Sequence, residues 1–380
     1  MPAPAHPANP RLDLAPVLTD PRTSIVVTCG SGGVGKTTTA AAMALWAADA
    51  GRNVAVLTID PAKRLAQSLG LRELDNDPRP VDVPLADPDG RLSAMMLDTR
   101  RTFDEMVSNH ATPERAQAIL ANPFYKVIST SFSGTQEYMA MEKLANLAGT
   151  GQFDLIVVDT PPSRSALDFL DAPQRLSSFM DGRMIKLLAT PSRGVMRLVG
   201  AGFALFSKAV TTILGGQMLA DAAQFVQLFE DMFGGFRERA QATYELLRAP
   251  GTKFVVVSIP EADALREASY FTDRLRTERM PLAGLVLNRT HPPLAELAAG
   301  AAQVAATRLE SSAPLASAVL DIHVQRLAVR AAEVHMRARF DRVHSDLPVV
   351  EVPSLPSDVH DVPALREIGR RLTGTLTGTR

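Results

Sequence analysis

Residues 30–38 have the composition of a phosphate-binding loop. They read Gly-Ser-Gly-Gly-Val-Gly-Lys-Thr-Thr, which satisfies the pattern G-x-x-x-x-G-K-[ST], between an apolar run and an Ala-rich helix expected over 37–50. In such loops backbone N–H groups turn toward an anion at a helix N-terminus. Lys36 is expected to reach the β- and γ-phosphates and Thr37 to hold Mg²⁺. The other residues expected to contact the nucleotide here are Gly32, Gly33, Val34, Gly35 and Thr38. The loop therefore predicts a nucleoside triphosphate site.

Two aspartates each end an apolar run further along the chain. Asp60 could orient the attacking water, or it could cap the helix that follows. After a phosphate-binding loop we favour the catalytic interpretation. Asp159 ends the run 155–159, and an aspartate in this position binds Mg²⁺, usually through a coordinated water. Residues 160–164 would then form a loop able to sense the γ-phosphate.

The remaining chain predicts the elements that position these residues. Apolar runs alternate with helical stretches, as in a parallel sheet covered on both faces. The fold class expected is α/β: a doubly wound, mainly parallel P-loop sheet with an inserted helical subdomain. Ligands in such sheets lie beyond the carboxyl ends of the strands, where the motifs fall. The expected strands are 25–29, 54–59, 92–97, 155–159, 254–258, 282–288 and 348–352.

We expect one domain over 23–372, with helical insertions at about 100–150 and 173–249. Helices are also expected within 294–344, and a loop over the proline-rich 75–90. Residues 1–22 and 373–380 are expected to be disordered tails.

Composition narrows the functional classes. The 380 residues are 46% hydrophobic and 21% charged, with a net charge of −1. This balance is ordinary for a globular protein and gives no field that would recruit nucleic acid. No signal peptide is apparent, so we expect a cytoplasmic protein, with a peripheral position at the inner membrane as the alternative.

Together these motifs resemble the arsenical-pump and guided-entry (tail-anchored protein targeting) ATPase family, a dimeric class with a deviant Walker A loop. The resemblance covers about 23–372, and the chain looks like an actinobacterial member of the anion-transporting type. It rests on residues 30–38, on Thr-Ile-Asp-Pro-Ala at 58–62 and on Asp-Thr-Pro-Pro-Ser at 159–163. Later motifs in the same order are Ile-Pro-Glu at 259–261, Val-Leu-Asn-Arg at 286–289, and Val-Pro-Ser-Leu-Pro at 352–356 with Asp358.

The resemblance implies roles for individual residues. Asp60 would be the switch I aspartate that positions the lytic water, and 159–163 would be switch II. Asn288 would read the adenine edge and so select ATP, although from the sequence alone it would be a turn residue after a strand. The loop from Pro353 to Pro356 would close over the base. ATP and Mg²⁺ are the implied ligands, and closure of a dimer is the implied motion.

Two departures from the family pattern bear on function. The family loop has a lysine, which reaches across the dimer, where this chain has Ser31. Three explanations follow: a paralogous partner supplies the lysine, a switch residue substitutes for it, or hydrolysis is slow. The candidate substitutes are Lys63, Arg64 and Arg164. The chain also has a single cysteine, Cys29, which disfavours arsenite activation and a zinc-clamped homodimer.

The helical segments offer a possible client surface. Residues 95–141 are rich in Met, Phe and Tyr, and 194–220 are strongly apolar with only two charged residues. These segments are either the core of a large domain or a flexible groove for an apolar helix. The Met, Phe and Tyr positions are Phe103, Met106, Phe124, Tyr125, Phe132, Tyr138, Met139 and Met141. The functions left open are targeting of an apolar-helix client, energising a membrane transporter for an anion, and regulating a paralogous ATPase in a heterodimer.

Overall fold

The computed structural model describes residues 9–60, 64–131, 135–161, 221, 224–225, 227–229 and 232–374. The chain divides into two compact units. The first comprises 1–96, 151–166 and 248–380, and it contains the sheet. The second comprises 97–150 and 167–247, and its described elements are helices.

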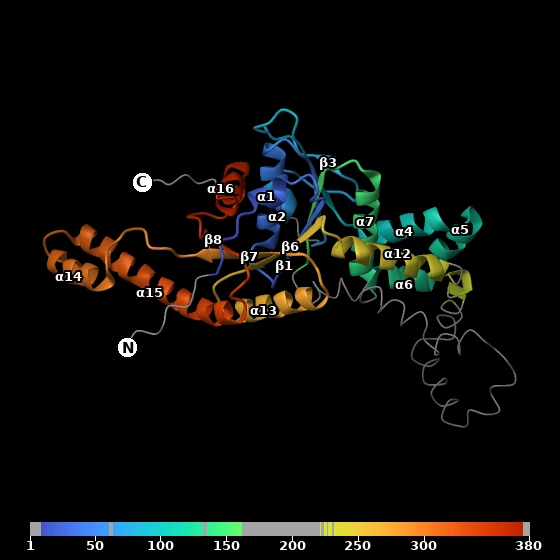
Figure 1. Ribbon diagram of the computed structural model, residues 1–380. Helices are drawn as coiled ribbons and strands as arrows, with labels where there is room; N and C mark the ends of the chain where they lie inside the picture. Colours follow the sequence, from blue (N-terminus) through green and yellow to red (C-terminus); the bar gives the residue numbers. More distant parts are fainter. Residues whose placement is uncertain are drawn as a thin grey trace, which may run out of the picture. The chain divides into compact units, whose positions relative to one another are not determined.

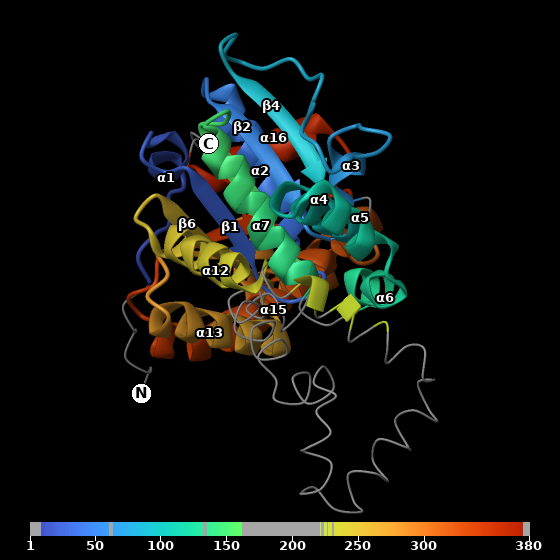
Figure 2. The same cartoon turned by 90° about the vertical axis from the view of Figure 1, so that its right-hand side faces the viewer.

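The sheet of the first unit has eight strands among the described residues, in the order β3-β4-β2-β5-β1-β6-β7-β8. Only β3 runs antiparallel to its neighbour there, and Figure 2 shows β4, β2, β1 and β6 in this order across the sheet, in which β5 lies between β2 and β1. The prediction of an α/β fold with a mainly parallel sheet is therefore confirmed. The strands are β1 (Ile25–Cys29), β2 (Asn53–Thr58), β3 (Arg79–Pro80), β4 (Arg91–Met96), β5 (Leu155–Asp159), β6 (Thr252–Ser258), β7 (Leu282–Thr290) and β8 (Val349–Pro353).

The central strands are buried on both faces, which explains their continuous apolar sequences. Every residue of β1 and β5 is buried. The register places Thr28 of β1 and Thr58 of β2 on either side of Asp159 in β5. Because these strands are parallel, their carboxyl ends meet at one edge, and the segments that follow them converge there.

Helices cover the two faces of this sheet. Helix α2 packs with α16 on one face, where a Cβ on Gly369 would lie 3.2 Å from the Cβ of Trp46. Helix α13 covers the other face beside β6 (Figure 1). Helices α14 and α15 pair as a hairpin, in which the Ser317 hydroxyl donates to the Ala306 carbonyl at 2.9 Å. The helices of this unit are α1 (Ala15–Thr19), α2 (Lys36–Asp49), α3 (Arg64–Ser68), α13 (Ala262–Thr277), α14 (Ala299–Leu309), α15 (Pro314–Val343) and α16 (Val362–Leu372).

Residues 9–22 are ordered, which corrects the expectation of a tail over 1–22. The Asn9 side chain is buried and donates to the carbonyls of His344 and Leu347. The segment then lies along the outer edge of β8, where Val349 donates to the Pro10 carbonyl at 2.8 Å and accepts from the Leu12 amide at 3.0 Å. These backbone bonds and the buried leucines that follow hold the segment, although its proline-rich start suggested disorder.

Other differences from the expected elements are smaller. Most strand ends shift by one or two residues, and the helix after the phosphate-binding loop begins at Lys36 and ends at Asp49. The loop expected over 75–90 contains β3, because residues there pair with β4 in the register Arg79 opposite Ala94. Helical structure expected from 294 begins only at α14.

The second unit has five described helices (Figure 2). Most of the Met, Phe and Tyr side chains singled out in its sequence are buried, and the rings of Phe103 and Tyr125 meet edge to face at 5.1 Å. Phe124 is half-buried, Phe132 lies outside the described residues, and so does the apolar segment 194–220. The described side chains therefore form a core. The helices are α4 (Thr99–His110), α5 (Pro113–Ala121), α6 (Pro123–Ser131), α7 (Thr135–Thr150) and α12 (Met232–Arg248).

None of the helices that the structure describes is both long enough and apolar enough to span a membrane.

Candidate functional site

The loop between β1 and α2 requires glycine at three positions. Gly30 has φ 151°, and a Cβ there would lie 2.1 Å from the Val257 carbonyl oxygen of β6. Gly33 and Gly35 have φ values of 78° and 95°, the left-handed region that side chains disfavour. Gly35 is also the N-cap of α2, so the loop leads directly into a helix N-terminus. This is the geometry that presents backbone N–H groups to an anion.

Lys36 is the first residue of α2 and is only 5% exposed. Its ammonium group donates to the carbonyls of Gly30 (3.0 Å) and Ser31 (2.8 Å), so it lies over its own loop. Burial lowers the pKa of Lys36, and the negative charge of Asp159 acts against that effect. A buried cation whose hydrogen bonds to the described residues go to carbonyl oxygens is well suited to exchange them for a phosphate.

Asp159 lies at the carboxyl end of β5 and is fully buried. One carboxylate oxygen accepts a hydrogen bond from the Thr58 hydroxyl at 2.9 Å. The other, Oδ1, is buried and accepts no hydrogen bond from the described residues. Burial raises the pKa of Asp159 to about 6, while the hydroxyls of Thr37 and Thr58 and the charge of Lys36 lower it.

These groups fit a magnesium ion. Magnesium prefers hard oxygen ligands, takes few of them from protein and shares the rest with water and phosphate. The unpartnered oxygen of Asp159 and the hydroxyl of Thr37 supply such donors beside the loop. A cation at this place would also compensate the cost of a buried carboxylate.

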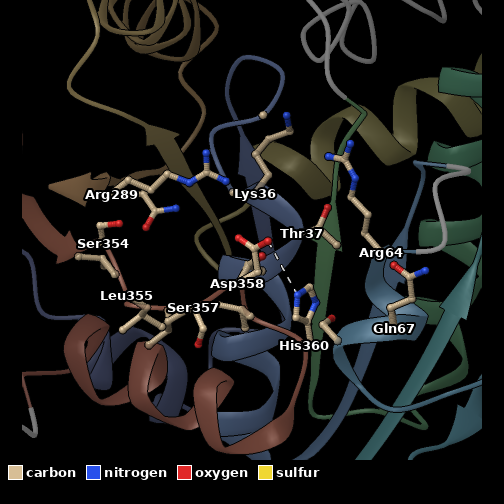
Figure 3. Close-up of a pocket in the computed structure, with 18 of the residues that line it drawn as sticks. Lys36, Thr37, Arg64, Gln67, Arg289, Ser354, Leu355, Ser357, Asp358 and His360 are labelled. Carbon is tan, nitrogen blue, oxygen red and sulfur yellow. Dashed lines mark ion pairs between the residues drawn. The ribbon is translucent and has the colours of Figure 1, made fainter.

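A cavity of about 540 Å³ opens beside the loop, and all the residues that line it belong to the first unit (Figure 3). Asp60 and Arg64 line the side that follows β2, and the backbone N–H of Asp60 donates to the Thr58 hydroxyl at 3.2 Å. The proposed switch residues Lys63 and Arg164, like residues 162–163, lie outside the described residues. Of the predicted site residues, those that line the cavity are Gly33, Gly35, Lys36, Thr37, Thr38, Asp60, Asn288 and Pro353.

The opposite side of the cavity comes from the ends of β7 and β8. The Asn288 amide donates to the Val34 carbonyl at 2.9 Å, which ties β7 to the phosphate-binding loop. A backbone bond from Ser354 to the Thr290 carbonyl, at 2.9 Å, joins the loop after β8 to β7. Four predicted residues do not line the cavity: Gly32, Val34, Asp159 and Pro356. Val34 and Asp159 are buried beside it, and that Asn288 reads adenine stays a prediction.

Some lining residues were not proposed as site residues from the sequence. Gln67 and Ser68 come from α3, and Ser357 and His360 from the loop after β8. His360 lies 3.9 Å from Asp358 at the mouth of the cavity (Figure 3). The sequence signal that could have identified these residues is their position after a predicted strand, because segments that follow the carboxyl ends of parallel strands converge on one site.

Cys29, at the end of β1, takes no part in this cavity. It is 1% exposed, and burial raises the pKa of its thiol to about 12. The thiol is therefore neutral, and it packs as a small apolar side chain.

Comparison with known proteins agrees with this geometry. The family model described as anion-transporting ATPase matches residues 23–313. The chain is 25% identical to ATPase GET3B of Arabidopsis thaliana over 360 residues, which cover 90% of the chain and 76% of the relative. It is 24% identical to ATPase get3 of Schizosaccharomyces pombe over 349 residues, covering 90% and 89%. It is 26% identical to ATPase GET3 of Podospora anserina over 262 residues, covering 68% and 71%.

Proposed function

The chain belongs to the anion-transporting ATPase family and is an ATP hydrolase, and on this basis we propose a specific cycle for it. In this cycle Mg²⁺-dependent binding and hydrolysis of ATP close and open a dimer. The closure controls the binding of a hydrophobic client or protein partner in the cytoplasm. The observation that carries the ATP-dependent part is the cavity beside Lys36, with the unpartnered oxygen of Asp159 behind it.

The phosphate side of the cavity supplies charge and hydrogen-bond donors. Lys36 exchanges its two loop carbonyls for phosphate oxygens, and the amides of residues 33–35 bind the same chain of phosphates. Thr37 and Asp159 would hold Mg²⁺, which neutralises phosphate charge when bound. Because Lys36 and Asp159 are buried, their interactions with the nucleotide are weakly screened by water.

Asp60 has the position of the residue that orients the attacking water. Its backbone is held by Thr58, the residue that also binds Asp159, so one threonine hydroxyl serves both aspartates. Asp60 follows β2 directly and lines the cavity. A carboxylate there accepts a hydrogen bond from water and directs its lone pair toward the γ-phosphate.

The other side of the cavity would hold the base. Asn288 is fixed against the loop through Val34, which places its amide beside Gly35. Pro353 begins the loop after β8 on the same side, and Pro356 follows in that loop without lining the cavity. In our proposal Asn288 reads the adenine edge, and the loop closes over it.

The catalytic assignment is tested with Asp60→Asn. We expect kcat for ATP hydrolysis to fall by about a hundredfold or more, with ATP affinity within a few fold of the wild type, because the amide is a weaker acceptor for the water proton. Asp263→Asn is the control, since its side chain is 88% exposed and lies outside the cavity. Unchanged turnover in Asp60→Asn would show that this role is wrongly assigned.

A heterodimer with a paralogous ATPase is the second candidate, and Ser31 favours it. Ser31 is a neutral hydroxyl at the position where the family loop has a lysine that reaches the partner's phosphates. One such cation in a site that excludes water stabilises the transition state by on the order of 3 kcal/mol. The test is native mass spectrometry of the complex isolated from its own cells, with ATP and with ADP. A homodimer that carries no second protein in either state would contradict both the heterodimer and the client proposals.

The client part of the proposal is supported by the sequence and the family resemblance. Most of the described aromatic and methionine side chains of the second unit are buried, so these side chains form a core. The apolar segment 194–220 remains the candidate, and it lies outside the described residues. Crosslinking groups placed in this segment should capture an apolar helical peptide in an ATP-dependent way. Capture that is equal with ATP, with ADP and without nucleotide would separate client binding from the ATPase cycle.

A further inference from the structure

Arg289, which follows Asn288, has an unusual backbone. Its φ is 56°, in the left-handed region that residues other than glycine rarely adopt. In the described part of the chain only Arg279, in the turn after α13, shares this property among non-glycine residues. Such conformations persist where the surroundings enforce them, and they concentrate at functional sites.

The neighbours of Arg289 explain how its conformation is enforced. Asn288 is fixed to the Val34 carbonyl, and the buried Thr290 accepts a backbone hydrogen bond from Ser354. The register between β7 and β8 shifts between residues 288 and 290, so Arg289 is an extra residue in the ladder. A bulge of this kind redirects one side chain while the strand on either side stays paired.

The redirected side chain points into the nucleotide cavity. Arg289 is exposed, lines the cavity, and extends its guanidinium group toward the phosphate-binding loop and Lys36 (Figure 3). Within the described part of the chain, no hydrogen bond or ion pair involves the Arg289 side chain. An arginine held at a bulge, without a partner, and directed at an anion-binding loop has the donor set that recognises phosphate oxygens.

We propose that Arg289 is a phosphate-binding residue of the ATP site, contributed by the same subunit as Lys36. It approaches the phosphates from the β7 side, and so adds a second cation in a loop environment where Ser31 is neutral. This inference rests on the proposed ATP-binding function, and it goes beyond that function by giving a role to Arg289, to which the motif at 286–289 assigned none. The β-bulge at Arg289 directs its side chain toward the cavity.

The test compares Arg289→Gly with Arg279→Gly. Glycine accepts a φ of 56° at both positions, so neither variant should unfold, and the two remove the same charge and the same backbone strain. Affinities for ATP and for AMP are measured by isothermal titration calorimetry with the full chain and Mg²⁺. We expect Arg289→Gly to weaken ATP binding by about tenfold to a hundredfold, the cost of losing charge-assisted hydrogen bonds, and to change AMP binding much less.

The other outcomes separate the possible errors. If Arg289→Gly and Arg279→Gly bind ATP equally well, Arg289 is not a phosphate ligand. An equal loss for ATP and AMP would assign the side chain to the nucleoside or the α-phosphate, and would overturn the assignment to the triphosphate chain. A wild-type protein that binds neither nucleotide would contradict the proposed function itself, independently of Arg289. Arg289→Lys should bind ATP more tightly than Arg289→Gly and less tightly than the wild type. Lysine keeps the positive charge but lacks the several N–H donors that a guanidinium group presents in one plane.

Discussion

Replacing Asp159 with asparagine should stabilise the nucleotide-free protein at neutral pH while it abolishes magnesium-dependent turnover. The carboxylate is fully buried, one of its oxygens accepts no hydrogen bond from the described residues, and burial raises its pKa from 3.8 to about 6. Asparagine keeps the oxygen that accepts from Thr58 and removes the buried charge.

The size of the effect follows from the difference in pKa between the folded and unfolded states. The folded state holds the Asp159 proton more tightly, so ionisation of this group opposes folding. The stability that this group contributes is fully present where Asp159 is protonated in both the folded and the unfolded state. That stability is lost as the pH rises from about 4 through about 6. At about 1.4 kcal/mol per pKa unit, a shift of about two units gives about 3 kcal/mol at pH 7. Asp159→Asn has no group that ionises here, so the variant does not lose this unfolding free energy at pH 7.

The assay is urea unfolding of the wild type and Asp159→Asn, without nucleotide or Mg²⁺, from about pH 4.5 to about pH 8. The difference in unfolding free energy between them should be small at the acidic end and reach about 3 kcal/mol in favour of the variant above pH 6. Asp263→Asn, at an exposed position, should show no such rise. A variant less stable than the wild type at pH 7, or a difference independent of pH, would refute the argument that Asp159 is a strained buried charge.

Two further predictions concern the stability of the first unit. Gly35→Ala should lower the free energy of unfolding, measured with denaturant, more than Gly33→Ala does. Both substitutions place a side chain at a left-handed φ, which costs about 1–2 kcal/mol. At Gly35 the new Cβ would also lie 2.3 Å from the Asn288 amide nitrogen, whereas at Gly33 it would meet nothing within 4 Å. The added loss is about 1 kcal/mol for the hydrogen bond to the loop, and equal costs for the two variants would contradict it. Arg52→Met should cost about 2–4 kcal/mol in the same assay, because its buried guanidinium donates to four backbone carbonyls. Arg22→Met, at a side chain that is 89% exposed, should change stability by less than about 0.5 kcal/mol.

The sheet could be predicted from the sequence because its strands are buried on both faces. Apolar runs such as 25–29 and 155–159 have the bounds that the structure gives them. The short β3 could not be foreseen, since Arg79–Pro80 is a polar, proline-containing pair that, among the described strands, pairs with β4 alone. The order of residues 9–22 was also missed, because it depends on backbone bonds to β8, more than three hundred residues away.

The candidate site was predictable where a short motif fixes its own backbone. Gly33, Gly35 and Lys36 are such a case, and they line one cavity together with Asp60, which lies more than twenty residues later. The roles assigned to these residues remain predictions. Arg289 illustrates the limit: its direction depends on a register shift between two strands, and no local sequence pattern encodes that shift.

The ends of the sheet restrict how this protein can associate. A free strand at a sheet edge is a template for adding a strand of another chain, which leads to open-ended aggregation. Here one edge is closed by the segment around Leu12, bonded to β8, and the other ends in β3, which is two residues long and contains Pro80. Neither of these described edges therefore offers a long, regular strand to a second copy of the chain. In the cycle that we propose, two subunits meet instead at the loops at the carboxyl ends of the strands, where the nucleotide binds, and the assembly stops at a closed pair.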